Sequence, residues 1–240
     1  MALWLPELTS DPLWFPAPET ALDQPDGLLA FGGDLSVSRL RQAYHLGIFP
    51  WFSAGDPLLW WSPGTRAVFQ PEALQAGRSL RKDWQKHQYS FSCNLAFSEV
   101  TAACAAPRRH QPSTWISTEI QQAYQQLHLA GIAHSLEVWQ NDQLVGGLYG
   151  IQVGTLFCGE SMFNRVPNAA KLALVQLQYY LRSFGMGWID CQLPNSFLLQ
   201  CGASPIARPA YLALLQQHRI QALPANLWIA GALAEGISSR

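Results

Sequence analysis

Charge is scarce in this 240-residue sequence, and neither sign is in excess. Charged residues make up 13% of the chain, and the formal net charge is −1. Proteins that bind nucleic acid through their overall field carry surplus lysine and arginine, so any such contact here must come from a local basic patch. The sequence also has no run of 18 apolar residues, and its start, M-A-L-W-L-P-E-L, has no basic leader. We therefore expect neither a membrane span nor a signal peptide.

The patterns that hold metals and disulfides are missing as well. The five cysteines are an odd number without a C-x-x-C pair, and the six histidines form no H-E-x-x-H motif. Such cysteines predict free thiols that fill the core of a cytoplasmic protein in a reducing environment. We expect no metal site.

Two motifs of common enzyme classes are incomplete. Residues 159–163 read G-E-S-M-F, so Phe163 replaces the last glycine of the G-x-S-x-G motif, and no predicted helix follows Ser161. A serine hydrolase is therefore disfavoured. The glycines at 146, 147, 150 and 154 lie within predicted strands, where they do not form a dinucleotide-binding loop.

The loop of a CoA-dependent acyltransferase is also altered. Such an enzyme carries glycines where the third strand of its central meander meets a helix, and this chain has R-V-P-N-A-A at 165–170. Pro167 lacks an amide donor, and Asn168 stands where a glycine would let the backbone wrap a pyrophosphate. If the chain transfers an acyl group, we expect a donor other than CoA.

Apolar and aromatic residues are abundant in the chain. Hydrophobic residues make up 49% of the sequence, which has ten tryptophans and is long enough for a substantial core. Near the N-terminus, Asp34 or Ser36 is placed to cap a helix that Gly47 would stop. The aromatic segments that follow could close a small N-terminal domain over residues 1–64, which leaves residues 65–240 for a second domain.

The second part alternates between helix and strand patterns. Helices are predicted over 78–87 and 117–130, and three strands follow with turns at Asn141-Asp142 and Gly154-Thr155. A further helix capped by Asn168, a strand over 188–193 and a short helix complete the pattern. We expect Leu172, Val175, Tyr179 and Phe184 to face inward from the longer helix. The order strand–strand–strand–helix–strand–helix is that of acetyltransferase-like folds, although the pattern alone indicates only an α/β or α+β protein.

One carboxylate lies inside an apolar strand. Alternation over 154–163 puts Glu160 on one face with Leu156, Cys158 and Met162, and puts Phe157, Ser161 and Phe163 on the other. Neither face is polar, so an ionised Glu160 needs a partner that is positive or donates hydrogen bonds. That partner is either another side chain or an amine that arrives with a substrate.

A second polar pair lies in the strand W-I-D-C-Q-L. Asp190 and Gln192 are two residues apart, so alternation points both side chains the same way. They either satisfy each other as a buried pair or hold an incoming amine and take its proton.

Several aromatic and basic residues could serve either the structure or contact with a nucleic acid. The group Phe49–Phe52, the pair Trp60-Trp61 and Trp115 either fill the core or stack on nucleobases. Two basic groups either face solvent or contact a phosphate backbone: Arg78, Arg81, Lys82 and Lys86, and the pair Arg108-Arg109.

Eight stretches, taken in order, resemble bacterial leucyl/phenylalanyl-tRNA–protein transferases over nearly the full length. They are G-L-L-A-F-G-G-D-L-S (27–36), G-I-F-P-W-F (47–52), L-W-W-S-P (59–63), T-W-I (114–116), H-S-L-E-V-W (134–139), L-V-G-G-L-Y-G (144–150), G-T-L-F-C-G-E-S-M-F (154–163) and I-D-C-Q (189–192). The resemblance implies an aminoacyltransferase that moves leucine or phenylalanine from aminoacyl-tRNA to proteins with N-terminal arginine or lysine, in the N-degron (N-end rule) pathway of protein degradation. It also implies an α+β monomer with a small N-terminal domain and an acetyltransferase-like (GNAT-like) domain, which needs no metal, CoA or other cofactor.

The resemblance assigns roles to individual residues. Glu160 would meet the α-amine of the aminoacyl group, and Asp190 and Gln192 would assist peptide-bond formation. Residues that would line the side-chain pocket or lie near the terminal adenosine are Phe157, Met162, Ile189, Leu148, Trp51 and Trp115. The cluster Arg78, Arg81, Lys82 and Lys86 would contact the tRNA.

Some positions depart from the family pattern. Ala170 replaces a serine, Leu148 replaces a methionine of some members, and Phe197 and Gln200-Cys201 replace a histidine and a serine–leucine pair. Two other classes stay open: a transferase that builds peptidoglycan cross-bridges from aminoacyl-tRNA, and a non-catalytic module that binds RNA or peptide.

Overall fold

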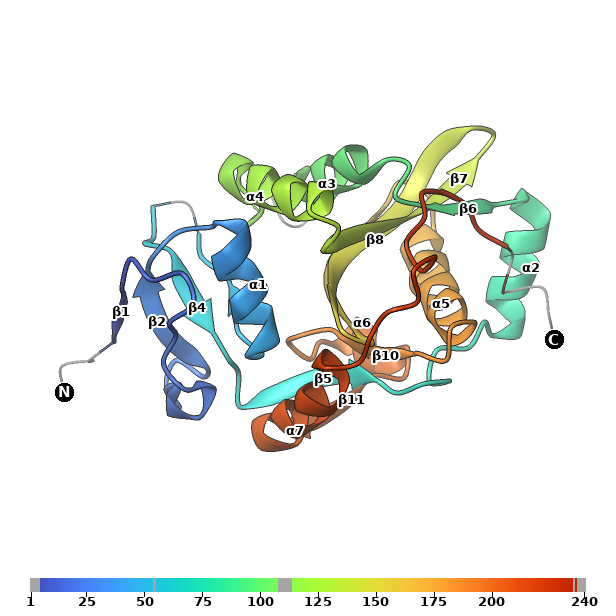
Figure 1. The fold of residues 1–240 in the computed structure, drawn as a ribbon. Helices are drawn as coiled ribbons and strands as arrows, with labels where there is room; N and C mark the ends of the chain where they lie inside the picture. Colours follow the sequence, from blue (N-terminus) through green and yellow to red (C-terminus); the bar gives the residue numbers. More distant parts are fainter. Residues whose placement is uncertain (1–4, 54, 108–113, 235, 237–240) are drawn as a thin grey trace.

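Two β-sheets organise the computed structural model, which describes residues 5–53, 55–107, 114–234 and 236. The smaller sheet has the strand order β1-β2-β4-β3, and the larger has the order β11-β5-β10-β9-β8-β7-β6-β12 (Figure 1). Helices cover both faces of the larger sheet. The protein is therefore a mixed α and β protein, as its sequence pattern indicates.

The smaller sheet forms from the first part of the chain. Its strands are β1 (Glu7–Leu8), β2 (Leu28–Gly32), β3 (Phe49–Pro50) and β4 (Leu59–Trp61), with a 3-10 turn η1 (Pro18–Thr20) and the helix α1 (Val37–His45) between them. The side chain of Ser36 accepts the backbone N–H of Arg39 at the start of α1. Gly47 has a φ of +77° just after its end, which a glycine adopts without strain. The predicted helix between Ser36 and Gly47 is confirmed.

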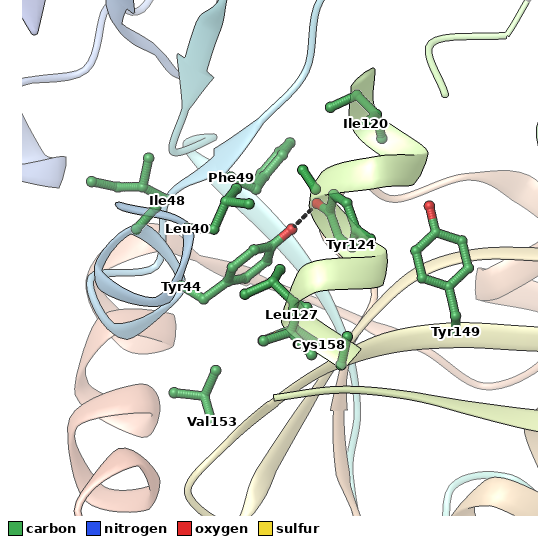
Figure 2. Close-up of a cluster of buried hydrophobic side chains, with 14 of the residues drawn as sticks. Leu40, Tyr44, Ile48, Phe49, Ile120, Tyr124, Leu127, Tyr149, Val153 and Cys158 are labelled. Carbon is green, nitrogen blue, oxygen red and sulfur yellow. Dashed lines mark hydrogen bonds between the residues drawn. The ribbon is translucent and has the colours of Figure 1, made fainter. Parts of the chain in front are cut away.

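The hydrophobic core runs without a break from this part into the rest of the chain. The smaller sheet ends at Trp61, and the chain enters the larger sheet at β5 (Thr65–Phe69). One core cluster nevertheless joins Leu40 and Tyr44 of α1 to Tyr124 and Leu127 of a helix on the larger sheet (Figure 2). The change of sheet lies beside residue 64, while a division into two domains at this point stays a prediction.

The larger sheet has a three-stranded antiparallel meander at its centre. Its remaining strands are β6 (Ser90–Cys93), β7 (Ala133–Gln140), β8 (Gln143–Val153), β9 (Leu156–Asn164), β10 (Trp188–Asp190), β11 (Ser204–Ala207) and β12 (Gly231–Ala232). Asn141 and Asp142 both have positive φ angles, 49° and 59°, as a tight two-residue hairpin requires. The meander of β7, β8 and β9 and both of its predicted turns are confirmed.

The helices divide between the faces of the larger sheet. They are α2 (Arg78–His87), α3 (Phe97–Ala105), α4 (Thr118–Leu129), α5 (Ala169–Arg182), α6 (Ser196–Gln200) and α7 (Arg208–Arg219). The core that includes α1, α3 and α4 covers one face, and the core around α5 and α2 covers the other. The predictions of α2, α4 and the order from β7 to α6 are confirmed, while α3 and α7 were not predicted.

The buried face of helix α5 agrees only in part with the prediction. Leu172 and Val175 are buried as predicted, but Tyr179 is only partly buried, and Phe184 lies beyond the end of the helix. Asn168 stands at the capping position with a φ of +66°, yet its side chain makes no cap. The predicted capping position is confirmed, but the side chain forms no capping hydrogen bond, and its amide nitrogen instead donates to Asp83 of α2 at 3.0 Å.

Within the described part of the chain, no helix is long and apolar enough to cross a membrane. The described residues also contain no group of three histidine, cysteine, aspartate or glutamate side chains that could hold a metal ion. All five cysteines are free thiols, and three of them, Cys93, Cys104 and Cys158, are buried.

Candidate functional site

A β-bulge places Glu160. Tyr149 of β8 pairs with Ser161, and the next residue, Gly150, pairs with Gly159, so Glu160 is an extra residue in β9. An extra residue reverses which side chains face which side of the sheet beyond it. The predicted alternation is therefore wrong beyond Gly159.

The bulge changes which side chains share a face. Phe157 and Met162 both pack on the α5 side of the sheet, whereas Cys158 and Phe163 both pack on the α4 side. Strict alternation would have separated Phe157 from Met162. The bulge thus puts Phe157 and Met162, two predicted pocket residues, on the same side of the sheet. Glu160 is the residue left out of the regular strand pairing.

The strand predicted over 188–193 is confirmed only over Trp188–Asp190, because β10 ends two residues before Gln192. Its parallel pairing with β9 ends where Asp190 meets Cys158. The carboxylate of Asp190 then accepts the backbone N–H of Gln192 at 2.9 Å, and Gln192 has a φ of +61°. Such a side-chain turn replaces the extended backbone. Asp190 and Gln192 therefore do not point the same way from one strand.

Asp190 forms a fully buried ion pair with Arg66 of β5. The Arg66 Nε donates to its Oδ1 at 3.2 Å, Nη2 donates to Oδ2, and the hydroxyl of Tyr211 donates to Oδ2 at 2.9 Å. Burial is the largest single effect on the pKa of Arg66 and lowers it, but Asp190, Tyr211 and Cys158 together raise that pKa above its usual range. With the Gln192 N–H, both carboxylate oxygens of Asp190 are fully engaged by protein donors.

Glu160 has a different set of partners, all of them neutral. Its Oε2 accepts the hydroxyl of Tyr124 at 2.9 Å, and its Oε1 accepts the side-chain amide of Gln192 at 2.6 Å. The Tyr124 hydroxyl is also hydrogen-bonded to that of Tyr44, at 2.5 Å (Figure 2). Within the described chain, Glu160 makes no ion pair.

The environment of Glu160 raises its affinity for a proton when no cation is present. Burial raises the pKa of Glu160 from 4.5 to about 7, although the Tyr44 and Tyr124 hydroxyls act in the opposite direction. The side chain is only partly buried. An ammonium group placed beside Glu160 would supply the positive partner that the protein does not provide.

A cavity of about 220 Å³ opens beside Glu160. The cavity is smaller than the usual site for a drug-sized ligand, which suits a single amino-acid side chain. Its lining includes four of the predicted pocket residues, Leu148, Phe157, Met162 and Ile189, together with Leu174, Leu177 and Leu198. The structure thus brings the four together around one apolar space with a carboxylate at its edge.

The predicted aromatic residues differ in their environments. Phe49 and Trp60 are buried in the core. Trp51 is 42% exposed and meets Trp61 edge to face at 5.4 Å. Trp115 is partly buried just before α4 and packs against the core that holds Tyr124. Neither Trp51 nor Trp115 lines the cavity, so their role toward an adenosine stays a prediction.

The predicted basic cluster lies on α2 and not at the cavity. Arg78, Lys82 and Lys86 are exposed, while Arg81 is partly buried and its Nε donates to the carbonyl of Ala76 at 2.7 Å. Figure 1 places α2 at the end of the molecule opposite the smaller sheet. The other predicted pair, Arg108-Arg109, lies outside the described residues.

The positions that depart from the family pattern lie around α5 and α6. Ala170 is buried on α5, whereas Phe197 and Gln200 of α6 are exposed and Cys201 is partly buried. Phe197 directly precedes Leu198, which lines the cavity. The departures on α6 therefore lie on its exposed side, next to a residue of the cavity wall.

Sequence reasoning missed Arg66, Tyr211, Tyr44 and Tyr124. A signal did exist for Tyr124, because it lies on the apolar stripe of a predicted helix with Ile120 and Leu127. A buried tyrosine hydroxyl needs a hydrogen-bond partner, and a buried carboxylate such as Glu160 is one that the sequence offers.

Comparisons with known proteins agree on one family. Residues 68–216 match the family model described as "Leucyl/phenylalanyl-tRNA protein transferase", and residues 33–64 match the model of its N-terminal domain. Proteins named leucyl/phenylalanyl-tRNA–protein transferase from Tolumonas auensis and Aeromonas hydrophila are 53% and 51% identical to this chain. Those alignments cover 95% and 97% of this chain, and 97% and 99% of the relatives.

Among solved structures, a crystal structure of FemX is similar over 75% of this chain and 71% of its own length. The sequence identity is 11% and the TM-score 0.43, a likeness too weak to carry an argument. The sequence matches, in contrast, extend over almost the whole chain at more than half identity. The chain therefore belongs to the leucyl/phenylalanyl-tRNA–protein transferase family.

Proposed function

We propose that this chain transfers leucine or phenylalanine from aminoacyl-tRNA to the N-terminal amine of an acceptor protein that begins with arginine or lysine. The observation that carries the proposal is Glu160, a carboxylate with neutral partners at the edge of an apolar cavity. The family membership supports the same reaction. Such a reaction belongs in the cytoplasm, where charged tRNA is made, and in the N-degron route to protein degradation.

The donor would be held at two points by the cavity. Its leucine or phenylalanine side chain would fill the space lined by Leu148, Phe157, Met162 and Ile189. Its α-ammonium would meet Glu160, whose two oxygens already accept from Tyr124 and Gln192. Charge-assisted hydrogen bonds are stronger than neutral ones, so ionised Glu160 would favour the bound donor.

The reaction is the aminolysis of an activated ester. The acceptor nitrogen attacks the ester carbonyl carbon, the bond from that carbon to the ribose oxygen breaks, and the proton lost from the amine ends on the ribose oxygen. No covalent enzyme intermediate and no cofactor is needed, so positioning and proton handling supply the acceleration.

Gln192 and Asp190 would play unequal parts in this step. The side-chain amide nitrogen of Gln192 donates to Glu160, and none of the hydrogen bonds within the described chain uses the side-chain Oε1 of Gln192. That oxygen is suited to accept an N–H of the attacking amine. Asp190 is fully engaged by Arg66, Tyr211 and the Gln192 backbone, so it would act through the position of Gln192.

The fold supports an acetyltransferase-like domain over 65–240 beside a small N-terminal domain over 1–64. Its support is the element order from β7 to α6 and the end of the β9–β10 pairing at Cys158 and Asp190, beyond which the side chains of Glu160 and Gln192 meet. The body of the tRNA would lie over α2, where Arg78, Lys82 and Lys86 are exposed. We expect the protein to work as a monomer.

The test is a transfer assay with labelled leucyl-tRNA and purified protein. A peptide with N-terminal arginine should take up the label, and the same peptide with an acetylated N-terminus should not, because its nitrogen no longer attacks. Label transfer to both peptides, or to neither, would contradict the proposal. Valyl-tRNA serves as the matched donor control and should be a poor substrate, since its side chain is smaller and branched at Cβ.

A further inference from the structure

The hydroxyl of Tyr149 is buried without a hydrogen-bond partner. Tyr149 lies on β8 with none of its surface exposed, and its hydroxyl makes no hydrogen bond to any residue that the structure describes. The hydroxyls of Tyr44, Tyr124 and Tyr211, which are buried to the same degree, are all hydrogen-bonded. A buried polar group without a partner costs about 1–3 kcal/mol, so the hydroxyl of Tyr149 calls for an explanation.

Tyr149 also lies in the wall of the cavity that Glu160 borders. Its ring stands perpendicular to that of Tyr124, with ring centres 5.6 Å apart, and Tyr124 donates to Glu160. In Figure 2 the Tyr149 hydroxyl points away from β8, toward the end of α4 that carries Ile120. Trp115 precedes this end of α4 and packs against the same core.

The donor carries groups that could pair with this hydroxyl. In an aminoacyl ester, the α-amine and the ester carbonyl carbon are both bonded to Cα. A donor whose amine meets Glu160 therefore places its ester and ribose oxygens within a few ångströms of the amine. Those oxygens accept hydrogen bonds, and a phenol donates one. Buried in the site without a donor, they would weaken binding.

We propose that Tyr149 is a donor-binding residue whose hydroxyl donates a hydrogen bond to an ester or ribose oxygen at the 3′ end of the aminoacyl-tRNA. This inference rests on the proposed function and extends it to a residue of β8, the strand paired with the one that carries Glu160. It also accounts for the unpaired hydroxyl, because the partner arrives with the substrate.

The test uses Tyr149→Phe, which keeps the ring and removes only the hydroxyl. We expect its affinity for a non-reactive leucyl-adenosine amide, measured by calorimetry, to fall roughly tenfold, the usual effect of one lost hydrogen bond in a buried site. Its Tm should stay the same or rise, because no hydrogen bond is lost in the free protein. The matched control is Tyr180→Phe, whose hydroxyl donates to the carbonyl of Leu227 away from the cavity. That control should lower Tm and leave the affinity unchanged.

Two results would overturn the inference. An unchanged affinity in Tyr149→Phe would show that the hydroxyl does not touch the donor. A lower Tm in Tyr149→Phe would show that the hydroxyl already has a partner in the free protein. If the wild-type protein did not bind the amide at all, the proposed function would fall together with this inference. If the wild type bound the amide and Tyr149→Phe bound it equally well, this inference would be wrong while the proposed function would stand.

Discussion

Two carboxylates on neighbouring strands, Asp190 and Glu160, have opposite environments. Asp190 is fully buried against the guanidinium of Arg66. Glu160 is partly buried, accepts only neutral donors from within the described chain and borders an apolar cavity. The comparison shows that a buried acid with a complete set of partners supports the structure, whereas an acid that lacks a cation is prepared to bind one.

The comparison also separates two residues that the sequence presents as a pair. Gln192 contacts Asp190 only through its backbone, while its side chain belongs to Glu160. The ion pair of Asp190 thus sets the turn, and the turn sets the amide that orients Glu160. The predictions below test this division of roles, from the largest expected effect to the smallest.

Asp190→Asn should destabilise the protein strongly. The substitution leaves the guanidinium of Arg66 buried without a negative partner, and breaking a buried ion pair in this way typically costs about 3–5 kcal/mol. The free energy of unfolding in urea measures the effect. Glu72→Gln is the matched control, because it breaks the solvent-exposed pair with Arg182 and should cost less than about 1 kcal/mol. Equal losses of unfolding free energy in the two variants would contradict the structural role of Asp190.

Gln192→Ala should slow the transfer step while the protein stays folded. Loss of a group that orients the attacking amine lowers rates by roughly 10²–10⁴-fold, and the cavity that binds the donor side chain is unchanged. Single-turnover kinetics at saturating donor would separate the transfer step from binding. Gln200→Ala, on the exposed side of α6, is the control and should behave as wild type. A Gln192→Ala variant that transfers at the wild-type rate would contradict the assigned role.

Glu160 should make the stability of the free protein depend on pH. Its pKa is raised to about 7 in the folded protein, above the value of about 4.3 in an unfolded chain. The folded state therefore binds more protons in this window, and stability should fall as pH rises from about 4.5 to about 7. In the wild type we expect the free energy of unfolding to fall by on the order of 1–3 kcal/mol over this window, and in Glu160→Gln we expect this fall to be lost. Parallel pH profiles of the two proteins would contradict the raised pKa.

The basic cluster on α2 should affect tRNA binding and leave the aminoacyl end untouched. Replacing Lys82 and Lys86 by alanine should reduce the dependence of log affinity on log salt by about two, roughly one for each lost phosphate contact. The affinity for a leucyl-adenosine amide should not change, because neither lysine lines the cavity. Arg41→Ala, an exposed residue of α1, is the control. An unchanged salt dependence in the double variant would place the tRNA elsewhere.

The sequence predicted what depends on neighbours along the chain. Ser36 and Gly47 bound α1, and Asn141-Asp142 joins two strands, because caps and tight turns are set by a few adjacent residues. The same local signals predicted α2 and the meander. The resemblance to the family added the pocket residues, which no local pattern assigns.

The sequence could not predict what depends on contacts between distant segments. The bulge at Glu160 appears only when β9 is paired with β8, and alternation within β9 alone gives the wrong face for Met162. The partners of the two acids come from residues far away along the chain, such as Arg66 for Asp190 and Tyr124 for Glu160. Such contacts are products of the fold, so a single sequence does not reveal them.

The central claim is that Glu160 binds the α-ammonium of the donor while Asp190 does not. The most direct measurement is a calorimetric cycle that combines two leucyl-adenosine amides, one with and one without the α-amine, with two proteins, wild type and Glu160→Gln. Removal of the amine should weaken binding to the wild type by roughly 10- to 100-fold, the usual worth of a hydrogen bond to a charged group. The same removal should have little effect on Glu160→Gln. An equal loss of affinity in both proteins would show that the ammonium binds elsewhere and would contradict the account.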